Sequence, residues 1–186
     1  DFGGQYNLLI ARRVRQSGVF CEIKSYRTPL AEIKAFSPDA VILTGGPATV
    51  FDEGAPTIDK SVFEMGVPVL GICYGMQLMV YTLGGDCRKA DKREYGKVLL
   101  NHVPSPLFKD VPDTSVCWMS HGVEVDSLPE GFKTTATSDY CGFCAVENEE
   151  KKLYGVQFHP EVVHTEYGTK ILENFLFEVC GLEKEW

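Results

Sequence analysis

The chain has 186 residues, which is enough for one domain with a sizeable core. It is 44% hydrophobic and 24% charged, as ordinary globular proteins are, and no apolar run approaches the roughly 20 residues that span a bilayer. The net charge of −8 argues against broad binding to nucleic acid phosphates.

Strands and helices alternate through the first half of the chain, which predicts an α/β sheet with helices on both faces. Apolar residues at helical spacing mark the helices, and continuous apolar runs mark strands that are buried on both faces. The expected helices cover residues 5–16, 30–36, about 57–65 and 75–83, and the expected strands cover 20–26, 40–43 and 67–72.

The second half changes in character after Gly84 and Gly85. Short extended pieces separated by Gly, Pro, Asn and Asp run from about 97 to 158, so this half is expected to be more antiparallel. A helix over 167–179 closes the chain. The predicted fold is a three-layer α/β domain with a mixed, mainly parallel central sheet, flanking helices and a smaller antiparallel sheet.

The first residues, 1–5, are typical of a strand end that turns into a helix, but the apolar strand that should lead into them is missing. An α/β sheet without that strand would expose core and a sheet edge. We therefore expect the sequence to be part of a longer chain, with one domain over 1–181 and the start of a linker at 182–186.

A buried strand runs into Gly71-Ile72-Cys73-Tyr74-Gly75 and then directly into a helix. This is the context of a nucleophile elbow, with Cys in place of Ser. A helix N-terminus favours the thiolate, and the backbone N–H of Tyr74 points to where an oxyanion would form. The alternative is a buried core cysteine at a strand end flanked by glycines.

The segment His159-Pro160-Glu161 follows another apolar strand. His159 and Glu161 are two residues apart, so they share a side in extended geometry, and Glu161 can orient the ring of His159 while its other nitrogen faces Cys73. A solvated His and Glu at a turn is the alternative. The predicted catalytic set is Cys73, His159 and Glu161.

Thr44-Gly45-Gly46-Pro47 ends a third buried strand. Two glycines let the backbone approach a substrate and offer an N–H to it, although a plain turn has the same composition.

The seven cysteines are an odd number without a secretory signal, which favours free thiols in a reducing cytoplasm. Cys141 and Cys144 form a CxxC motif, which could be a redox pair or half of a zinc site. No second CxxC exists, so two small apolar residues near a strand is the favoured interpretation.

Together these motifs resemble the class I glutamine amidotransferases, the type with a Cys, His and Glu triad. The likeness covers essentially the whole chain and is closest to the amidotransferase domain of the GMP synthases. The segments that carry it are Asp1–Tyr6, Leu43–Pro47, Gly71–Gln77, Arg93–Gly96, Trp118–Gly122 and Tyr154–Val162.

The resemblance implies further roles. The backbone N–H groups of Gly46 and Tyr74 would form the oxyanion hole. Gln77 and the segment Ser120, His121, Gly122 and Val123 would contact the bound glutamine, with His121 structural rather than basic. The family often has Asp where this chain has Val123, so a domain contact from position 123 is in doubt. It also often has Ser where this chain has Gly4.

The implied activity is hydrolysis of L-glutamine in the cytoplasm, without metal or cofactor in this half. A synthetase domain, absent from this sequence, would use ATP and magnesium to adenylate XMP and would take up the ammonia to make GMP. Three alternatives stay open: another acceptor, as in anthranilate or carbamoyl phosphate synthesis; a γ-glutamyl hydrolase; and a glutamine-binding module without catalysis.

Overall fold

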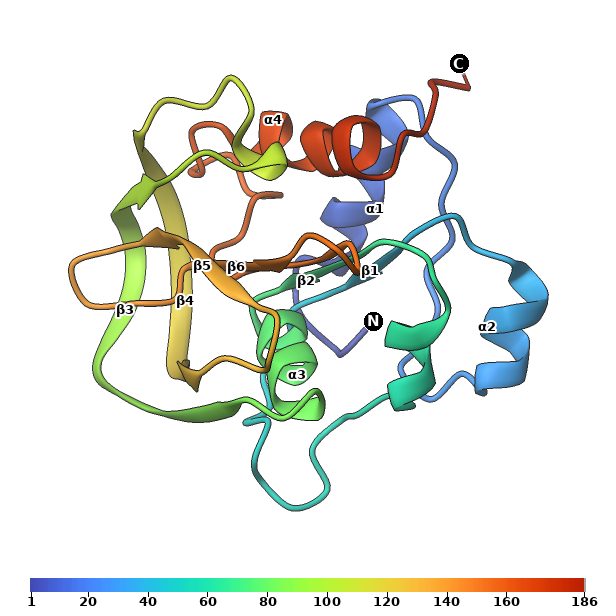
Figure 1. Ribbon diagram of the computed structural model, residues 1–186, viewed down its shortest axis with the longest axis horizontal. Coiled ribbons are helices and arrows are strands. Elements are labelled where there is room, and N and C mark those ends of the chain that lie inside the picture. The colour runs from blue at the N-terminus through green and yellow to red at the C-terminus, as the bar shows by residue number, and fades with distance from the viewer. Residues whose placement is uncertain (186) are drawn as a thin grey trace.

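One seven-stranded sheet organises the molecule, in a computed structural model that describes residues 1–185 (Figure 1). Its order is β1-β2-β7-β6-β5-β3-β4. The strands are β1 (Val41–Leu43), β2 (Val69–Ile72), β3 (Asp86–His102), β4 (Thr114–Ser127), β5 (Lys133–Thr137), β6 (Ala145–Asn148) and β7 (Leu153–Val156). Trp186, the last residue of the expected linker, lies outside the described residues.

The sheet has a parallel part and an antiparallel part. β1, β2 and β7 are parallel, with Leu43 opposite Gly71 and Gly71 opposite Gly155, and the remaining neighbours pair antiparallel. The switch occurs at the β6–β7 hairpin, because a connection this short can join only antiparallel strands. The predicted mixed α/β fold with flanking helices is confirmed. The sheet was expected to be mainly parallel with a smaller antiparallel sheet beside it, but the antiparallel strands continue the same sheet, and four of its six neighbouring pairs are antiparallel.

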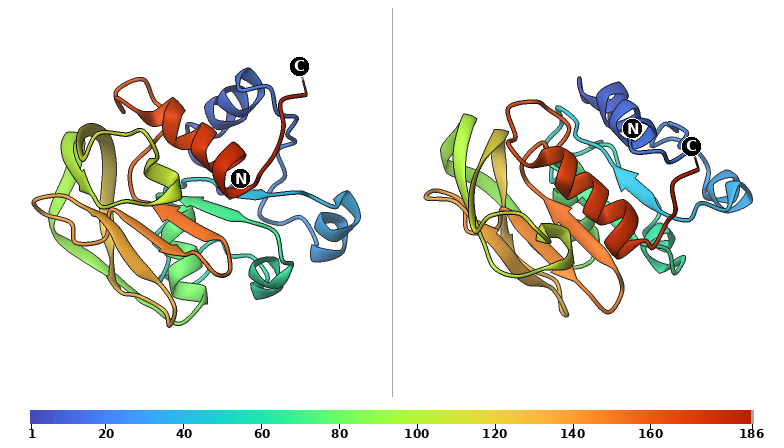
Figure 2. Two further views of the ribbon diagram at one scale, coloured as in Figure 1. Left: turned by 45° about the horizontal axis from the view of Figure 1, so that its top comes forward. Right: turned by 90° about the horizontal axis from the view of Figure 1, so that it is seen from above.

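Helices cover both faces, as Figures 1 and 2 show. On one face α1 (Asn7–Gln16) lies beside α4 (Gly168–Glu173), which continues as a π-helical segment, Asn174–Val179. On the other face lies α3 (Tyr74–Thr82), buried from Tyr74 to Val80 because it is apolar nearly all round. α2 (Leu30–Phe36) lies at the β1 end of the sheet. These helices fall where the sequence predicts them.

Three details differ from the prediction. The expected strand at 20–26 has no regular secondary structure, ends in a turn at Tyr26 and belongs to no sheet within residues 1–185. The expected helix at 57–65 is a 3₁₀ turn, Lys60–Glu64, whose start is capped by the Asp59 carboxylate accepting from Ser61 N at 2.9 Å. A second 3₁₀ turn, Pro106–Phe108, interrupts the antiparallel part, whose strands β3 and β4 form a long hairpin rather than short pieces.

The core lies on both faces of the sheet. Leu70, Ile72 and Val156 pack with α4 and the π-helical segment, whereas Val69 and Leu153 pack with α3. Within residues 1–185, no helix has the length and apolar character needed to cross a bilayer. In α/β folds ligands gather at the carboxyl ends of the parallel strands, which here are the ends of β1, β2 and β7.

Candidate active site

Cys73 occupies a strained turn between β2 and α3. Its φ of 54° and ψ of −110° lie outside the regions that a residue with a side chain prefers. Its backbone N–H donates to the Val156 carbonyl at 2.8 Å, which ties the turn to β7. Cys73 is 7% exposed, borders a cavity and stands at the N-terminus of a helix.

Two glycines make this turn possible. A Cβ on Gly71 would lie 2.7 Å from the Gly75 carbonyl, and a Cβ on Gly75 would overlap the Leu43 carbonyl oxygen. Both contacts are with backbone atoms, which cannot move aside without a large cost in free energy. The glycines of the motif are therefore required by the packing of α3 against β1 and β2.

His159 and Glu161 form a buried pair three to five residues beyond the end of β7. His159 Nδ1 lies 2.5 Å from Glu161 Oε1, and both side chains are nearly inaccessible to solvent. Arg13 Nε donates to the Glu161 carbonyl at 3.1 Å, and Thr165 Oγ1 donates to the His159 carbonyl at 2.6 Å. These bonds fix the ring orientation that a general base needs.

The electrostatics of His159 depend on both neighbours. Burial lowers its pKa, but hydrogen bonds and charge interactions with Cys73 and Glu161 outweigh that and raise the pKa to about 10. At neutral pH the imidazole is therefore held as a cation between Cys73 and Glu161. This is the charge distribution of a Cys–His nucleophile pair.

Gly45 lies next to both Cys73 and His159. A Cβ at this position would lie 3.2 Å from His159 Cε1 and 3.7 Å from Cys73 Cβ. The ends of β1, β2 and β7 thus bring Gly45, Cys73 and His159 to one point of the sheet edge. The three motifs predicted from the sequence converge, as expected for neighbouring parallel strands.

The predicted oxyanion groups lie at the same place. Gly46 and Tyr74 both border the cavity, and neither backbone N–H donates to another group within residues 1–185. Tyr74 is the first residue of α3, whose first N–H groups have no intrahelical partner. A Cβ on Gly46 would overlap the Phe2 carbonyl oxygen, so the N-terminal residues support this loop.

The predicted substrate contacts line a cavity of about 510 Å³, a size typical of small-molecule sites. Gln77 and all four residues from Ser120 to Val123 border it. Gln77 Nε2 donates to the Val123 carbonyl at 2.9 Å, so this side chain also ties α3 to β4, the strand that carries Ser120–Val123. The Cys73 thiol lies 3.7 Å from the Ser120 carbonyl.

Two further residues of the site were not predicted. Gln157 is fully buried, and its Nε2 donates to Cys73 Sγ at 3.5 Å. Arg93, on β3, borders the mouth of the cavity, and a Cβ on Gly122 would meet its Nε at 3.4 Å. Both residues lie in segments that carry the family resemblance, Tyr154–Val162 and Arg93–Gly96, but the sequence analysis gave neither of them a role in the site.

His121 is paired with Glu94 and not with the reactive cysteine. Its Nε2 lies 3.3 Å from the buried carboxylate of Glu94, and its Nδ1 lies 3.0 Å from the Val123 carbonyl. Cys141 is also near, since possible ligand atoms of Glu94, His121 and Cys141 lie within 4.8 Å of one another. Both cysteines of the CxxC are free and buried.

Comparisons with known proteins agree with this geometry. The family described as "Glutamine amidotransferase class-I" matches residues 1–179. Proteins named "GMP synthase [glutamine-hydrolyzing]" from Caldicellulosiruptor saccharolyticus and Acetivibrio thermocellus are 56% and 55% identical over the whole chain. The chain spans 37% of the length of these relatives.

Solved structures show the same fold. A protein from Thermoplasma acidophilum, provisionally named as one subunit of a GMP synthase, superposes with a TM-score of 0.87 at 30% identity, covering 97% of this chain and 91% of its own. A glutamine amidotransferase from Thermotoga maritima gives a TM-score of 0.68 at 21% identity, covering 86% and 83%, and this likeness concerns the fold alone.

Proposed function

Because the chain belongs to the class I glutamine amidotransferases, we propose that it hydrolyses L-glutamine to glutamate and ammonia. The observation that carries the proposal is the arrangement of Cys73 on its strained turn, with its thiol in a cavity beside a His159 that Glu161 holds at 2.5 Å. A thiolate, an imidazolium and a carboxylate in this order form a nucleophile, an acid–base group and an orienting group.

The reaction begins when the Cys73 thiolate attacks the side-chain amide carbon of glutamine. The oxygen of that amide becomes an oxyanion, which the N–H groups of Gly46 and Tyr74 stabilise. His159 then gives its proton to the nitrogen, the carbon–nitrogen bond breaks, and ammonia leaves. A γ-glutamyl thioester remains on Cys73.

The second half restores the site. His159, now neutral, takes a proton from water, and the resulting hydroxide attacks the thioester carbon. The carbon–sulfur bond breaks, glutamate leaves, and Cys73 is again a thiolate beside the His159 cation. Through both halves Glu161 holds His159 Nδ1 at 2.5 Å and keeps the ring aimed at the thiol.

The acceptor of the ammonia is proposed to be XMP, adenylated on a synthetase domain that uses ATP and Mg²⁺, so that the product is GMP. The support is the identity of more than half of all positions with proteins named GMP synthase. The cytoplasmic location expected from the sequence stays a prediction.

Labelling with a glutamine-mimicking diazo ketone, followed by mass spectrometry, tests the nucleophile. We expect one covalent adduct on Cys73, prevented by excess L-glutamine. The six other cysteines are the internal controls. An adduct on Cys21 or Cys117 instead, or release of glutamate by a Cys73→Ala chain, would refute the proposal.

A further inference from the structure

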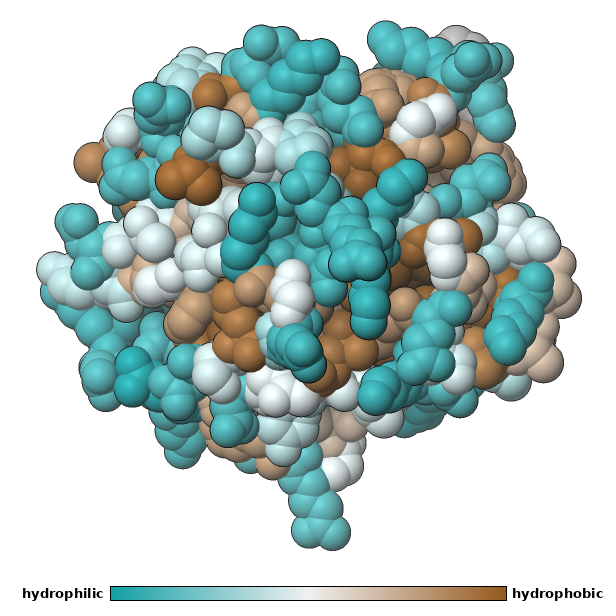
Figure 3. Space-filling view, in the orientation of Figure 1, coloured by the Kyte–Doolittle hydropathy of each residue, from teal (hydrophilic) through white to brown (hydrophobic). Residues whose placement is uncertain are grey.

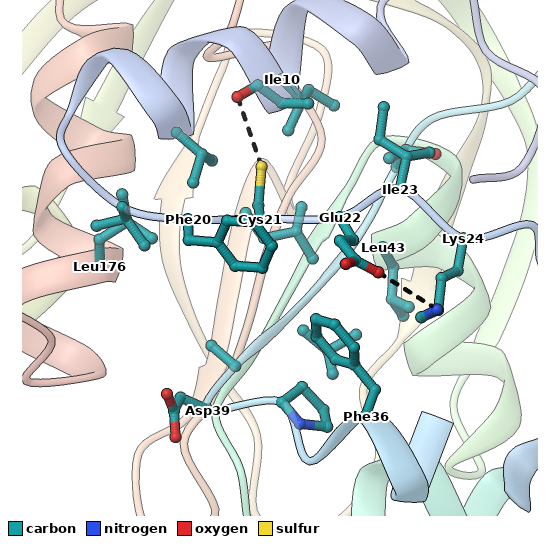
Figure 4. A pocket seen from close by; sticks show the side chains of 18 of the residues that line it. Ile10, Phe20, Cys21, Glu22, Ile23, Lys24, Phe36, Asp39, Leu43 and Leu176 are labelled. Atoms are coloured by element: carbon teal, nitrogen blue, oxygen red, sulfur yellow. Dashed lines mark hydrogen bonds and ion pairs between the residues drawn. The ribbon is translucent and has the colours of Figure 1, made fainter. Parts of the chain in front are cut away.

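A cavity of about 870 Å³, larger than the reactive one, runs along β1 beside α1 and Phe36 of α2 (Figure 4). Apolar side chains line most of it, and Figure 3 shows apolar surface in the hollows of one face of the molecule. Glu22 and Lys24 at its border lie 3.6 Å apart and are partly exposed. The buried polar side chains that face a reactive atom lie instead behind the smaller cavity, next to Cys73.

Two buried glutamine side chains connect the reactive sulfur with the strand that borders the substrate cavity. Gln77 lies on α3, one helical turn after Cys73, and Gln157 directly follows β7. Gln77 Nε2 donates to the Val123 carbonyl at 2.9 Å and to Gln157 Oε1 at 3.1 Å. Gln157 Nε2 donates to Cys73 Sγ at 3.5 Å. Gln77 and Gln157 are 3% and 0% exposed, so solvent water does not compete for these bonds.

The Val123 carbonyl determines which way both amide groups point. A carbonyl oxygen can only accept, so the Gln77 atom beside it is the nitrogen, which carries two hydrogens. The second hydrogen faces Gln157, and the Gln157 atom that meets it is the oxygen, because two NH₂ groups would repel each other. The nitrogen of Gln157 is therefore turned toward the sulfur. The fold in this way presents an N–H donor to Cys73 Sγ.

The other neighbours of the sulfur do not supply a donor at every stage of the reaction. The Ser120 carbonyl, 3.7 Å from Cys73 Sγ, can accept the thiol hydrogen but offers nothing to a charged sulfur. His159 has given its proton to ammonia by the time the thioester forms. An amide N–H does not titrate, so the Gln157 donor is present in both halves of the reaction.

We propose that Gln157 is a catalytic residue whose amide N–H stabilises the charge that develops on Cys73 Sγ during thioester hydrolysis, and that Gln77 is the positioning residue that orients it. This rests on the proposed function. When hydroxide bonds to the thioester carbon, the carbon–sulfur bond breaks and its electron pair moves to sulfur, which accepts the bond from Gln157 Nε2. Neutral sulfur is a weak acceptor and a charged one is strong, so this bond strengthens as the charge forms and lowers the barrier.

Rapid-quench kinetics of Gln157→Met test the donor, because methionine has a similar shape and no N–H. We expect thioester hydrolysis to slow by about 10- to 100-fold, so that γ-glutamyl-Cys73 accumulates during turnover and is detected by mass spectrometry. The matched control is Asn174→Leu. Asn174 is 1% exposed, and its Nδ2 donates to the carbonyls of Leu107 and Lys109 at 2.9 Å each. This variant also loses a buried amide, and it should unfold at a lower temperature without accumulating thioester.

Alkylation of Cys73 by iodoacetamide over a range of pH tests the donor without glutamine. The reagent reacts with the thiolate, so Gln157→Met should move the alkylation profile about one pH unit higher, and Asn174→Leu should leave it in place. Gln77→Met should move the profile in the same direction, although Gln77 does not touch the sulfur. The double variant should move it no further than Gln157→Met alone, because Gln77 acts through Gln157.

An alkylation profile of Gln157→Met that matches that of the unchanged chain, together with no accumulated thioester, would overturn the proposal. Additive shifts in the double variant would overturn the positioning role of Gln77. These outcomes are separate from a failure of the proposed function. If the unchanged chain released no glutamate, glutamine hydrolysis would be refuted, whereas the alkylation profiles would still decide whether the Gln157 N–H acts on the sulfur.

Discussion

Two groups of Cys, His and Glu lie close together in this molecule, and only one is built for reaction. In the first group His159 bonds Glu161 at 2.5 Å beside Cys73, and in the second His121 bonds Glu94 at 3.3 Å near Cys141. All six side chains are buried. Residue composition and burial therefore do not distinguish the two groups.

Their backbones do. Cys73 stands at a strand end and a helix N-terminus with a positive φ and borders the 510 Å³ cavity, whereas Cys141 lies in the loop before β6, does not border it, and is 2% exposed. Both ring nitrogens of His121 face oxygens, and Glu94 also accepts from Ser138 at 2.9 Å. In the second group, the hydrogen-bonding atoms of His121 and Glu94 are taken up by other residues of the chain. In the first group, the Cys73 thiol borders the cavity in which substrate would bind.

The largest expected difference between the two groups is the effect of removing the cysteine on glutamate release. Cys73→Ala should reduce glutamate release by at least about 10⁴-fold, because the covalent route is lost. Cys141→Ala should change it by less than about threefold, since its thiol does not reach the cavity. Steady-state assays of glutamate release on both variants, with folding checked by circular dichroism, decide this. Comparable losses of glutamate release in both variants would contradict the conclusion that only the Cys73 group is built for reaction.

The two carboxylates should also differ. Glu161→Gln should lower kcat by about 10³-fold with little change in KM, since the His159 cation and its orientation are lost. Glu94→Gln should act chiefly on KM, because Glu94 holds His121 on the part of β4 that borders the substrate cavity. Full kinetic curves separate the effects. A loss in kcat of the same size from both would mean that the second pair takes part in the chemistry.

The pH dependence follows from His159. Its pKa is raised to about 10, so the proton it gives to ammonia is present below that pH and lost above it. kcat should therefore fall by about tenfold per pH unit once the pH rises beyond 10. The same raised pKa stabilises the fold below its ordinary value of 6.5, and this contribution is lost as the pH rises through 10.

Glu161→Gln sharpens this test, because removing the carboxylate charge should move the alkaline limb of the activity profile to lower pH. Glu94→Gln is its matched control and should leave the limb in place. A limb that stays near pH 10 in the Glu161→Gln chain would assign that titration to another group.

The reactive end of the sheet could be predicted from the sequence because its signals are local. Gly71 and Gly75 flank one residue, and His159 and Glu161 are two positions apart, so short motifs at strand ends carried the essential contacts. Gln157 and Arg93 could not be predicted in this way. Their roles arise from where the β7 end and the β3 hairpin lie in space, and no local pattern records that.

The fold was predictable to a similar degree. Buried parallel strands and their helices have strong apolar patterns, and the strands β1 and β2 and the helices α1, α3 and α4 predicted from them are present in the structure. The segment 20–26 has the pattern of a strand, but strand formation needs a neighbour with free backbone groups. The turn at Lys60–Glu64 is too short for its apolar residues to distinguish a 3₁₀ helix from an α-helix.

The positive φ of Cys73 implies that the conformation needed for activity lowers the stability of the fold. A side chain in this conformation costs about 1–3 kcal/mol of folding free energy, which glycine would not incur. Cys73→Gly should therefore unfold at a higher temperature than Cys73→Ala, although alanine normally stabilises more than glycine. Thermal denaturation of these two inactive chains, identical but for one methyl group, would measure how much stability this protein gives up to keep its thiol reactive.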